Sequence, residues 1–362
     1  MTATAMVLEA PRRLVRRQFP LPEIGDNDAL LRVEACGLCG TDHEQYTGTL
    51  AAGYAFVPGH ESVGIIEQIG PGAEERWRVA AGDRVAVEVF QSCRSCDACA
   101  AGEYRRCQVH GLRDMYGFIP VDKPPWLWGG YASYQYLAPD SMVLPVPSDL
   151  DRVMASLFNP LGAGIRWGVT VPGTKPGDTV AVLGPGIRGL SVIAAVQEAD
   201  ASFVMVTGNG PKDAPRLEMA KAFGADLVVD VATHDPVSEL RNAGLRGADV
   251  VVDVTAKAPA AFAQAVALAA PGGTIVVAGT RGVPETPGFH PDHLVYKELR
   301  VLGALGVDVT AYAAALELLA AHRYPFAQLP RRVTNLDGVE ALLQTMAGEG
   351  DDVPPVHGVV VP

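Results

Sequence analysis

The second half of the chain constrains the fold most, because short apolar segments alternate there with segments of helical periodicity. The apolar segments are continuous, which is typical of strands that are buried on both faces of a parallel sheet. Strands and helices in strict alternation build a doubly wound α/β fold. The expected strands span residues 179–183, 203–206, 227–229, 250–254 and 274–278, and the expected helices span residues 187–199, 214–223, 236–243 and 258–270.

The rest of the chain has a different texture. Residues 1–150 are rich in Gly, Pro and short alternating apolar runs, a pattern that predicts a twisted β fold. After residue 290 the pattern becomes mixed strand and helix again. We therefore predict a β-rich domain of residues 1–158 and 296–362, into which a domain with the parallel sheet, residues 159–295, is inserted.

The formal net charge of −12, from 41 acidic and 29 basic residues, argues against anionic partners. Nucleic acid and anionic membranes repel such a chain, so we expect a small-molecule ligand. No run of about 18 apolar residues is present to span a bilayer, and residues 1–11 lack the basic-then-apolar order of a signal peptide. The sequence predicts a cytoplasmic protein with no nucleic-acid or membrane partner.

All six cysteines lie in the first third of the chain. Disulfides are rare in the cytoplasm, so this clustering indicates metal ligation. Cys93, Cys96, Cys99 and Cys107 have the spacing C-x2-C-x2-C-x7-C. Four thiolates at such short intervals can close a tetrahedron around Zn²⁺ with no open position, which is typical of a structural site. An iron–sulfur cluster and four unconnected thiols are the alternatives.

A second group of metal-ligand residue types lies upstream of this run. Cys39 is followed by Gly, Thr41 and an acidic residue, and His60-Glu61 follows about twenty residues later. A thiolate, an imidazole and a carboxylate are the ingredients of a catalytic zinc site, which has three protein ligands and one open position. Cys36 is either a further ligand or a small core residue.

Gly184, Gly186 and Gly189 form a G-x-G-x-x-G turn between an expected strand and an expected helix. Gly184 permits the tight turn, Gly186 lets a pyrophosphate approach the backbone, and Gly189 lets the helix pack closely on the strand. The helix N-terminus at Ile187 and Arg188 supplies N–H groups and partial positive charge to the phosphates. The turn predicts a Rossmann-type dinucleotide site.

The residue that usually selects NAD over NADP is absent. About 20 residues after such a turn, an acid at the end of the second strand binds the adenine ribose, but this chain has Gly208 there. Gly208 leaves room for a 2′-phosphate, so we expect NADP rather than NAD. Asp213, on the longer loop, is the alternative ribose contact and favours NAD. The candidate contacts to a 2′-phosphate are Thr207, Asn209, Lys212 and Arg216.

In this order the motifs resemble those of the zinc-containing medium-chain alcohol and polyol dehydrogenases, near the sorbitol and threonine dehydrogenase branch. The resemblance covers essentially the whole chain and includes the runs 59–70 and 82–85. It implies a GroES-like catalytic domain, two zinc ions per chain, NAD or NADP, and a homodimer or homotetramer. It also implies that Cys39 and His60 bind the catalytic zinc with Glu61 as a direct ligand, that the four clustered cysteines bind the structural zinc, and that Cys36 matches no ligand position.

This chain departs from the family pattern at two places. Asn159 stands where the polyol branch has Glu and other branches have Cys. Asn is a weak neutral ligand, so we expect its amide to hydrogen-bond a zinc-bound water or the substrate. The alternative is that Asn159, instead of Glu61, completes the zinc shell. Zn²⁺ with thiolate Cys39, neutral His60 and carboxylate Glu61 sums to zero charge, which polarises an alcohol oxygen better than an anionic site would.

The second departure concerns the proton relay. Where relatives often have His five positions after the cysteine, this chain has Glu44, with His43 one place earlier. Thr41 keeps the hydroxyl that the resemblance assigns to taking the alcohol proton. Thr41, His43 and Glu44 are therefore the candidate relay residues.

Together these features predict a zinc-dependent oxidoreductase that moves hydride between an alcohol and NAD(P), with a ketone or aldehyde as product. The alternatives are a non-catalytic nucleotide-binding protein on the same fold and a zinc-independent quinone or enoyl reductase. Aromatic residues in segments that could line a pocket favour a bulky or cyclic secondary alcohol; they are Tyr46, Phe56, Tyr116, Trp126 and Trp128.

Overall fold

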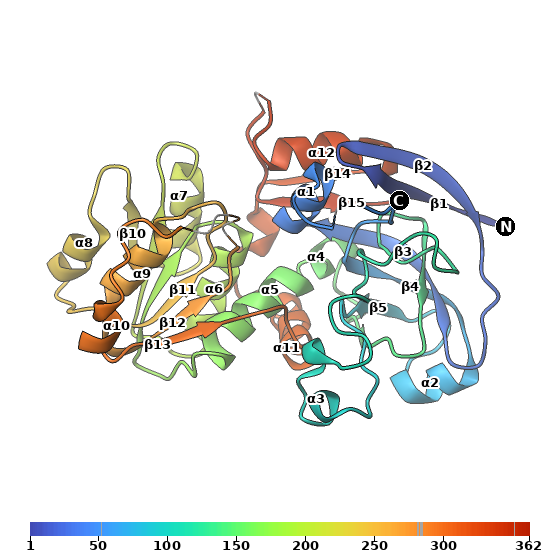
Figure 1. Cartoon of the computed structure of the whole chain (residues 1–362), viewed down its shortest axis with the longest axis horizontal. Helices are drawn as coiled ribbons and strands as arrows, with labels where there is room; N and C mark the ends of the chain where they lie inside the picture. Colours follow the sequence, from blue (N-terminus) through green and yellow to red (C-terminus); the bar gives the residue numbers. More distant parts are fainter. Residues whose placement is uncertain (52, 281, 283–284, 351) are drawn as a thin grey trace. The chain divides into compact units, whose positions relative to one another are not determined.

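A computed structural model describes residues 1–51, 53–280, 282, 285–350 and 352–362 of the chain (Figure 1). The chain forms two compact units, which are described separately. Unit 1 comprises Met1–Phe158, Leu316–His322 and Phe326–Pro362, and unit 2 comprises Asn159–Ala315 and Arg323–Pro325.

Unit 2 carries a parallel sheet with helices packed on it. Its strands are β8 (Thr179–Leu183), β9 (Phe203–Gly208), β10 (Leu227–Asp230), β11 (Ala248–Asp253), β12 (Ala269–Val277) and β13 (Arg300–Gly303). Its helices are α5 (Phe158–Ile165), η2 (Arg166–Thr170), α6 (Ile187–Glu198), α7 (Ala214–Ala222), α8 (Pro236–Asn242), α9 (Ala261–Leu268), α10 (Asp292–Tyr296) and the first part of α11 (Val309–Ala320).

The six strands are ordered β10-β9-β8-β11-β12-β13, and every pairing is parallel (Figure 1). This is the strand order of a doubly wound dinucleotide-binding sheet, so the predicted fold class is confirmed. Helices α6 and α7 pack against each other and against β9, while α8 packs against α9. The central strand β8 is buried along its whole length, as its continuous apolar sequence predicts.

The C-terminal limit of unit 2 differs from the predicted domain boundary. The first segment of unit 1 ends at Phe158, the predicted position, but unit 2 continues to Ala315, twenty residues beyond 295. The reason is β13, which pairs in parallel with β12 and so completes the sheet of unit 2. A four-residue strand carries no sequence signal for the sheet that it joins.

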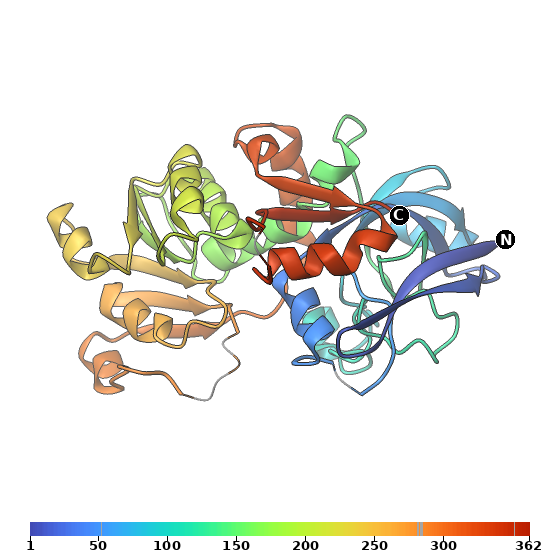
Figure 2. The ribbon, with the colours of Figure 1, turned by 90° about the horizontal axis from the view of Figure 1, so that it is seen from above.

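Unit 1 is the β-rich part of the chain. A sheet runs in the order β14-β15-β3-β4-β5-β7, with β6 paired to β3, and β1 pairs with β2 in a separate hairpin. Helix α12 packs on β14 and β15 (Figure 2). The strands are β1 (Thr2–Ala10), β2 (Arg13–Pro20), β3 (Ala29–Leu38), β4 (Glu61–Ile69), β5 (Arg84–Val87), β6 (Tyr134–Leu137), β7 (Val143–Pro145), β14 (Arg331–Thr334) and β15 (His357–Val360).

Short helices connect these strands. No helix among the described residues is both long and apolar enough to cross a membrane. The helices of unit 1 are α1 (Gly40–Thr47), α2 (Pro71–Trp77), α3 (Asp97–Ala100), η1 (Tyr104–Arg106), α4 (Arg152–Ala155), η3 (Phe326–Gln328), η4 (Leu336–Gly338) and α12 (Val339–Met346), together with the end of α11.

Candidate functional site

Cys39 lies at the junction between β3 and α1, where it caps the helix. Its backbone is extended, with φ −120° and ψ 176°, and its N–H donates to Asp42 Oδ2 at 2.9 Å. A side chain at the third helical position that binds the cap N–H is one half of a capping box. Asp42 therefore holds the turn that presents the Cys39 thiol.

His60 comes to the same place from the start of β4. Gly59 precedes it with φ +92°, and a Cβ at Gly59 would lie 2.7 Å from the ring of Tyr131, so only glycine fits there. His60 Nε2 is 3.4 Å from Cys39 Sγ, and His60 Nδ1 is 3.5 Å from Asp42 Oδ1. Cys39, Asp42 and His60 are buried, with ligand-type atoms within 4.8 Å of one another.

The charges of the groups in this cluster favour a bound cation. Burial lowers the pKa of His60, but the neighbouring Cys39 and Asp42 outweigh burial and raise it well above the usual value. The two acidic groups thus stabilise positive charge on the buried imidazole. Zn²⁺ placed between a thiolate and an imidazole nitrogen supplies that charge instead of the proton, so the donors fit a metal.

Asp42 belongs to the cluster that the structure brings together, but the sequence analysis did not single it out as a site residue. It lies on the Nδ1 side of His60, whereas Cys39 Sγ lies on the Nε2 side. A carboxylate in this position fixes the tautomer and orientation of a ligating histidine. The signal was present in the sequence, because an acid three residues after the helix cap is the spacing of a capping box.

Glu61, the predicted third ligand, is buried at the first position of β4. Its carboxylate packs over Gly37 of β3, where an added Cβ would collide with Glu61 Oε2. The group that the structure brings together around Cys39 and His60 contains Asp42 in its place. The role of Glu61 in binding metal stays a prediction.

The candidate relay residues all lie on α1. Thr41 and Glu44 are half-buried, and His43 is buried. His43 Nε2 is 2.9 Å from Glu349 Oε1, and Arg12 also binds the Glu349 carboxylate. The hydrogen bonds from Arg12 and then His43 lower the pKa of Glu349 to about 2. His43 is therefore linked to an ionised carboxylate, and its part in proton transfer stays a prediction.

Asn159 begins unit 2 and is held by two hydrogen bonds within that unit. Its Nδ2 donates to the hydroxyl of Tyr312 at 2.8 Å, and its Oδ1 accepts from Arg188 at 3.5 Å. The Arg188 guanidinium also lies over the ring of Trp167, 5.0 Å from its centroid. Asn159 is thus joined to the start of α6, and the predicted contact of its amide with substrate or water remains a prediction.

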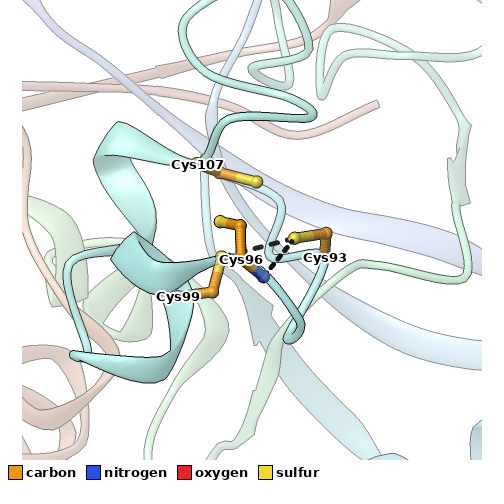
Figure 3. Close-up of side chains that lie close together, drawn as sticks. All are labelled: Cys93, Cys96, Cys99 and Cys107. Atoms are coloured by element: carbon orange, nitrogen blue, oxygen red, sulfur yellow. Dashed lines mark hydrogen bonds between the residues drawn. The ribbon is translucent and has the colours of Figure 1, made fainter.

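The four clustered cysteines converge on one point (Figure 3). Their sulfur atoms all lie within 4.8 Å of one another, and Cys93 Sγ is 3.8 Å from Cys99 Sγ. A tetrahedron with Zn–S bonds of about 2.3 Å has edges of about 3.8 Å, so the spacing fits a single zinc ion. The thiolates of an iron–sulfur cluster bind different irons, which requires wider spacing. All six cysteines of the chain are free thiols.

Hydrogen bonds and burial shift the pKa values of thiols in the cysteine lobe, the segment from Cys93 to Cys107. Hydrogen bonds from Ser95, and from the N–H of Cys96, lower the pKa of Cys93 to about 5. Burial raises the pKa of Cys99 to about 11. One ligand is thus a thiolate at neutral pH, and another needs the metal to lose its proton.

The glycine turn has the geometry that its spacing predicts. Gly184 has φ +104°, and an added Cβ at Gly189 would collide with the Gly184 carbonyl oxygen. Gly186 caps α6, and the space where its Cβ would point is open. The N-terminal N–H groups at Ile187 and Arg188 therefore follow an uncrowded turn, as phosphate binding requires.

The predicted room beside Gly208 does not exist. Gly208 is buried at the end of β9, and a Cβ there would lie 2.9 Å from Asp213 Cβ and 3.0 Å from Pro185 Cγ. The argument for NADP from free space at Gly208 was therefore wrong. Of the other candidate contacts, Thr207 is buried and Lys212 is exposed. The backbone N–H of Asn209 and the guanidinium of Arg216 both donate to the Asp213 carboxylate.

The proposed aromatic pocket is also wrong for four of its five residues. Tyr46, Phe56, Tyr116 and Trp128 are at most 4 % exposed and belong to the cores of unit 1. Trp126 stacks on Phe19 of β2 instead. These side chains stabilise the fold, so they carry no argument for a bulky or cyclic substrate.

An apolar residue beside the cluster was not singled out from the sequence. Phe118 is half-buried, and its ring lies 6.0 Å from the ring of His60, between centroids. It is the aromatic side chain that packs next to His60 of the cluster. A lone Phe in a turn-rich segment gives no sequence signal for this contact.

Comparison with known proteins agrees with this architecture. Residues 25–148 match the Alcohol dehydrogenase GroES-like domain, and residues 189–321 match the Zinc-binding dehydrogenase family. The Mycobacterium tuberculosis protein named "Probable alcohol dehydrogenase adh" is 72% identical over 99% of this chain and 98% of its own length. Sorbitol dehydrogenase of Bacillus subtilis is 31% identical over 87% of this chain and 85% of its own.

Solved structures give the same result. A zinc-binding dehydrogenase of Sinorhizobium meliloti 1021, solved with NADP, superposes with a TM-score of 0.85 at 27% identity, and the match covers 100% of both chains. The fold and the paired metal-ligand clusters define an NAD(P)-dependent oxidoreductase acting on alcohols. The chain belongs to the zinc-binding alcohol dehydrogenase family, and the predicted family is confirmed.

Proposed function

We propose that Cys39 Sγ and His60 Nε2 hold a catalytic zinc, with Glu61 as third ligand and Asp42 orienting His60. The observation that carries this proposal is the buried cluster of Cys39, Asp42 and His60, whose acidic groups favour a cation on the imidazole. Glu61 completes the set because Zn²⁺, two anionic ligands and a neutral imidazole sum to zero charge. Zinc held by three protein ligands would be able to bind the substrate hydroxyl as well.

The chain's own residues then position the reactants and move the proton. Zinc supplies Lewis acidity toward a hydroxyl oxygen, and nicotinamide supplies the hydride acceptor. The Thr41 hydroxyl, in the first turn of α1, would accept the proton of the substrate alcohol while it donates its own proton onward. His43 or Glu44, further along the same helix, passes the proton to solvent. Phe118 excludes water from the reacting carbon beside His60.

We also propose a second, structural zinc in the cysteine lobe, so that each chain binds two zinc ions. The distance of 3.8 Å between Cys93 Sγ and Cys99 Sγ supports a single, tetrahedrally bound ion. The nicotinamide dinucleotide binds at the turn formed by Gly184, Gly186 and Gly189, as a relative solved with NADP supports. The thiol state of all six cysteines is typical of a cytoplasmic protein, which is the location we propose.

The substrate that we propose is a secondary alcohol, with a ketone as product. The support comes from relatives rather than from a pocket. One relative is named L-threonine 3-dehydrogenase and is 32% identical over 81% of this chain, and carbon 3 of threonine carries a secondary hydroxyl. Other relatives are named for sorbitol and for erythritol or L-threitol, which also contain secondary hydroxyls.

The proposed function is tested by metal analysis together with turnover. We expect the purified protein to contain two zinc ions per chain and to reduce a nicotinamide dinucleotide with secondary alcohols faster than with primary alcohols of equal size. A chelator that removes the zinc held by Cys39 and His60 should abolish turnover, and added Zn²⁺ should restore it. Full zinc content without turnover on any alcohol or ketone would favour a non-catalytic protein, and turnover without zinc would favour a zinc-independent reductase.

We further propose that the protein is a homodimer or homotetramer, assembled through the edge of the sheet in unit 2. Strand β13 is the last strand of that sheet, and an edge strand offers unpaired backbone groups. Four large apolar side chains near it are exposed, which is unusual on a monomer. They are Val295 at 72 %, Tyr296 at 77 %, Val301 at 40 % and Leu305 at 53 % exposure.

This assembly predicts that Tyr296→Glu weakens the oligomer. Charge repulsion and loss of apolar contact at the edge should shift the solution mass, measured by light scattering after size exclusion, toward that of one 38.1 kDa chain. Val353→Glu, at an 80 % exposed apolar position in unit 1, is the matched control and should keep the wild-type mass. A wild-type protein that runs as a monomer at micromolar concentration would contradict the proposal.

A further inference from the structure

The loop between β9 and α7 is held by two carboxylates. Asp213 Oδ2 accepts the N–H of Asn209 at 2.9 Å, and Asp230 Oδ1 accepts the N–H groups of Gly210 at 2.7 Å and Ala232 at 2.9 Å. The bonds from these backbone groups lower the pKa of Asp230, which is therefore charged at neutral pH. Consecutive backbone donors of the loop are thus already bound by anions.

Asp213 occupies the place from which a ribose-binding acid would branch. A Cβ built on Gly208, the last residue of β9, lies 2.9 Å from Asp213 Cβ. It also lies 3.0 Å from Pro185, the residue between Gly184 and Gly186 in the glycine turn. Asp213 therefore lies beside the turn, although it is five residues beyond the end of the strand.

A 2′-phosphate entering this loop would meet unfavourable charge. It would face the carboxylates of Asp213 and Asp230, and it would have to displace them from the N–H groups of Asn209 and Gly210. Arg216 Nη1 is 3.5 Å from Asp213 Oδ1, so its charge is shared with that carboxylate. A ribose 2′-hydroxyl, in contrast, donates a hydrogen bond to a carboxylate without any of these costs.

We propose that Asp213 is the specificity-determining residue for the dinucleotide, and that it selects NAD(H) over NADP(H) by binding the adenine ribose in place of an acid at Gly208. The side chain is suited to this role because it is 22% exposed while its carboxylate is fixed by Asn209. The inference rests on the proposed binding of the cofactor at the glycine turn. It reverses the expectation of NADP that the absence of an acid at Gly208 suggested.

The test is equilibrium binding of NADH and of NADPH to the zinc-loaded protein, measured by isothermal titration calorimetry. We expect the wild type to bind NADH at least about tenfold more tightly than NADPH, because a hydrogen bond to a charged group is lost and a like charge is added. Asp213→Asn keeps an oxygen for the Asn209 N–H but removes the charge. In this variant the preference for NADH should fall by about tenfold or more, mainly through weaker binding of NADH.

Glu218→Gln is the matched control, since it removes one negative charge from the same helix α7 at an exposed side chain, and its NADH preference should be that of the wild type. Asp213→Ser provides a second variant, and wild-type melting temperatures show that both are folded. Equal or tighter binding of NADPH by the wild type would overturn the inference, as would equal weakening of both nucleotides in Asp213→Asn. Failure to bind either nucleotide would overturn the proposed cofactor turn as well.

Discussion

Replacing His60 with alanine is expected to abolish alcohol oxidation while binding of NADH stays at the wild-type level. The imidazole supplies one of two ligand atoms that lie 3.4 Å apart, so its loss removes the catalytic zinc. Loss of a Lewis acid at the reacting oxygen costs several kcal/mol of transition-state stabilisation, or more than about a thousandfold in rate. Nucleotide binding is unaffected because the glycine turn belongs to unit 2 and His60 to unit 1. Turnover, zinc content and NADH titration together measure this.

The neighbouring cysteines give this prediction its control. Cys39→Ser should lose one zinc and turnover, as His60→Ala does. Cys36→Ser makes the same substitution three residues earlier, at a buried thiol near the hydroxyl of Ser62 and the carbonyl of Gly37, both of which can bond serine. It should keep both zinc ions and its activity. Loss of zinc in Cys36→Ser with retention in Cys39→Ser would exchange the roles of the two thiols.

The order of effects among the remaining acidic and amide groups identifies the third ligand. Glu61→Gln should lose the zinc if Glu61 ligates. Asp42→Asn should keep much of the zinc but lose about 10- to 100-fold in affinity or rate, as partners of a ligating histidine do. Asn159→Ala should keep the zinc and lose about 1–3 kcal/mol of transition-state stabilisation. A harmless Glu61→Gln together with zinc loss in Asn159→Ala would reverse the assignment.

The sheet of unit 2 was predictable because its strands carry their own signal. Segments such as 180–183 and 250–252 are apolar throughout, as is typical of strands buried on both faces, and the helical segments between them favour parallel pairing. The predicted limit at residue 295 was wrong because β13 (Arg300–Gly303) is short and mostly exposed. Strand β13 belongs to this sheet because it pairs with β12. That contact is non-local, so the hydrophobic periodicity of the sequence does not predict it.

The clusters of metal-ligand residue types were predictable for a related reason. Cysteine and histidine at ligand spacing are rare for any other purpose, so Cys39, His60 and the four-cysteine run stand out. Asp213 and Asp42 stand out less, because acids in turns and at helix starts are common: Asp213 is only the alternative ribose contact, and the spacing of Asp42 indicates a helix cap. What distinguishes Asp213 is its contact with the end of β9, which depends on how the loop folds back.

For the aromatic residues, the sequence predicted a role in substrate binding that the structure does not support. Tyr116 and Trp128 are aromatic residues of the kind that line pockets, but both are buried in the core of unit 1. The sequence alone does not distinguish a pocket residue from a core residue. In the structure, hydrogen bonds to the backbone identify both side chains as core residues. The Tyr116 hydroxyl accepts the N–H of Ala138, and the Trp128 indole N–H donates to the Lys123 carbonyl. Side chains anchored in this way on the backbone of unit 1 do not serve a substrate.

Cys99→Ser is expected to lower the free energy of unfolding by more than about 4 kcal/mol and to reduce the zinc content by one ion per chain. The lobe between Cys93 and Cys107 contains only α3 and η1, four and three residues long, so it has few apolar contacts of its own. A closed four-thiolate site therefore supplies the energy that orders it. Denaturant unfolding followed by circular dichroism, with zinc measured on the same sample, tests both effects.

The matched control for this variant leaves all four ligands in place. Ser95→Ala removes the hydrogen bond to Cys93 that keeps the pKa of that thiol low, without removing a sulfur. It should keep two zinc ions at neutral pH and release the structural ion at a higher pH than the wild type does on acidification, because a more basic thiolate competes better for protons. Wild-type stability and zinc content in Cys99→Ser would show that the lobe holds no metal, whatever the spacing of its sulfurs.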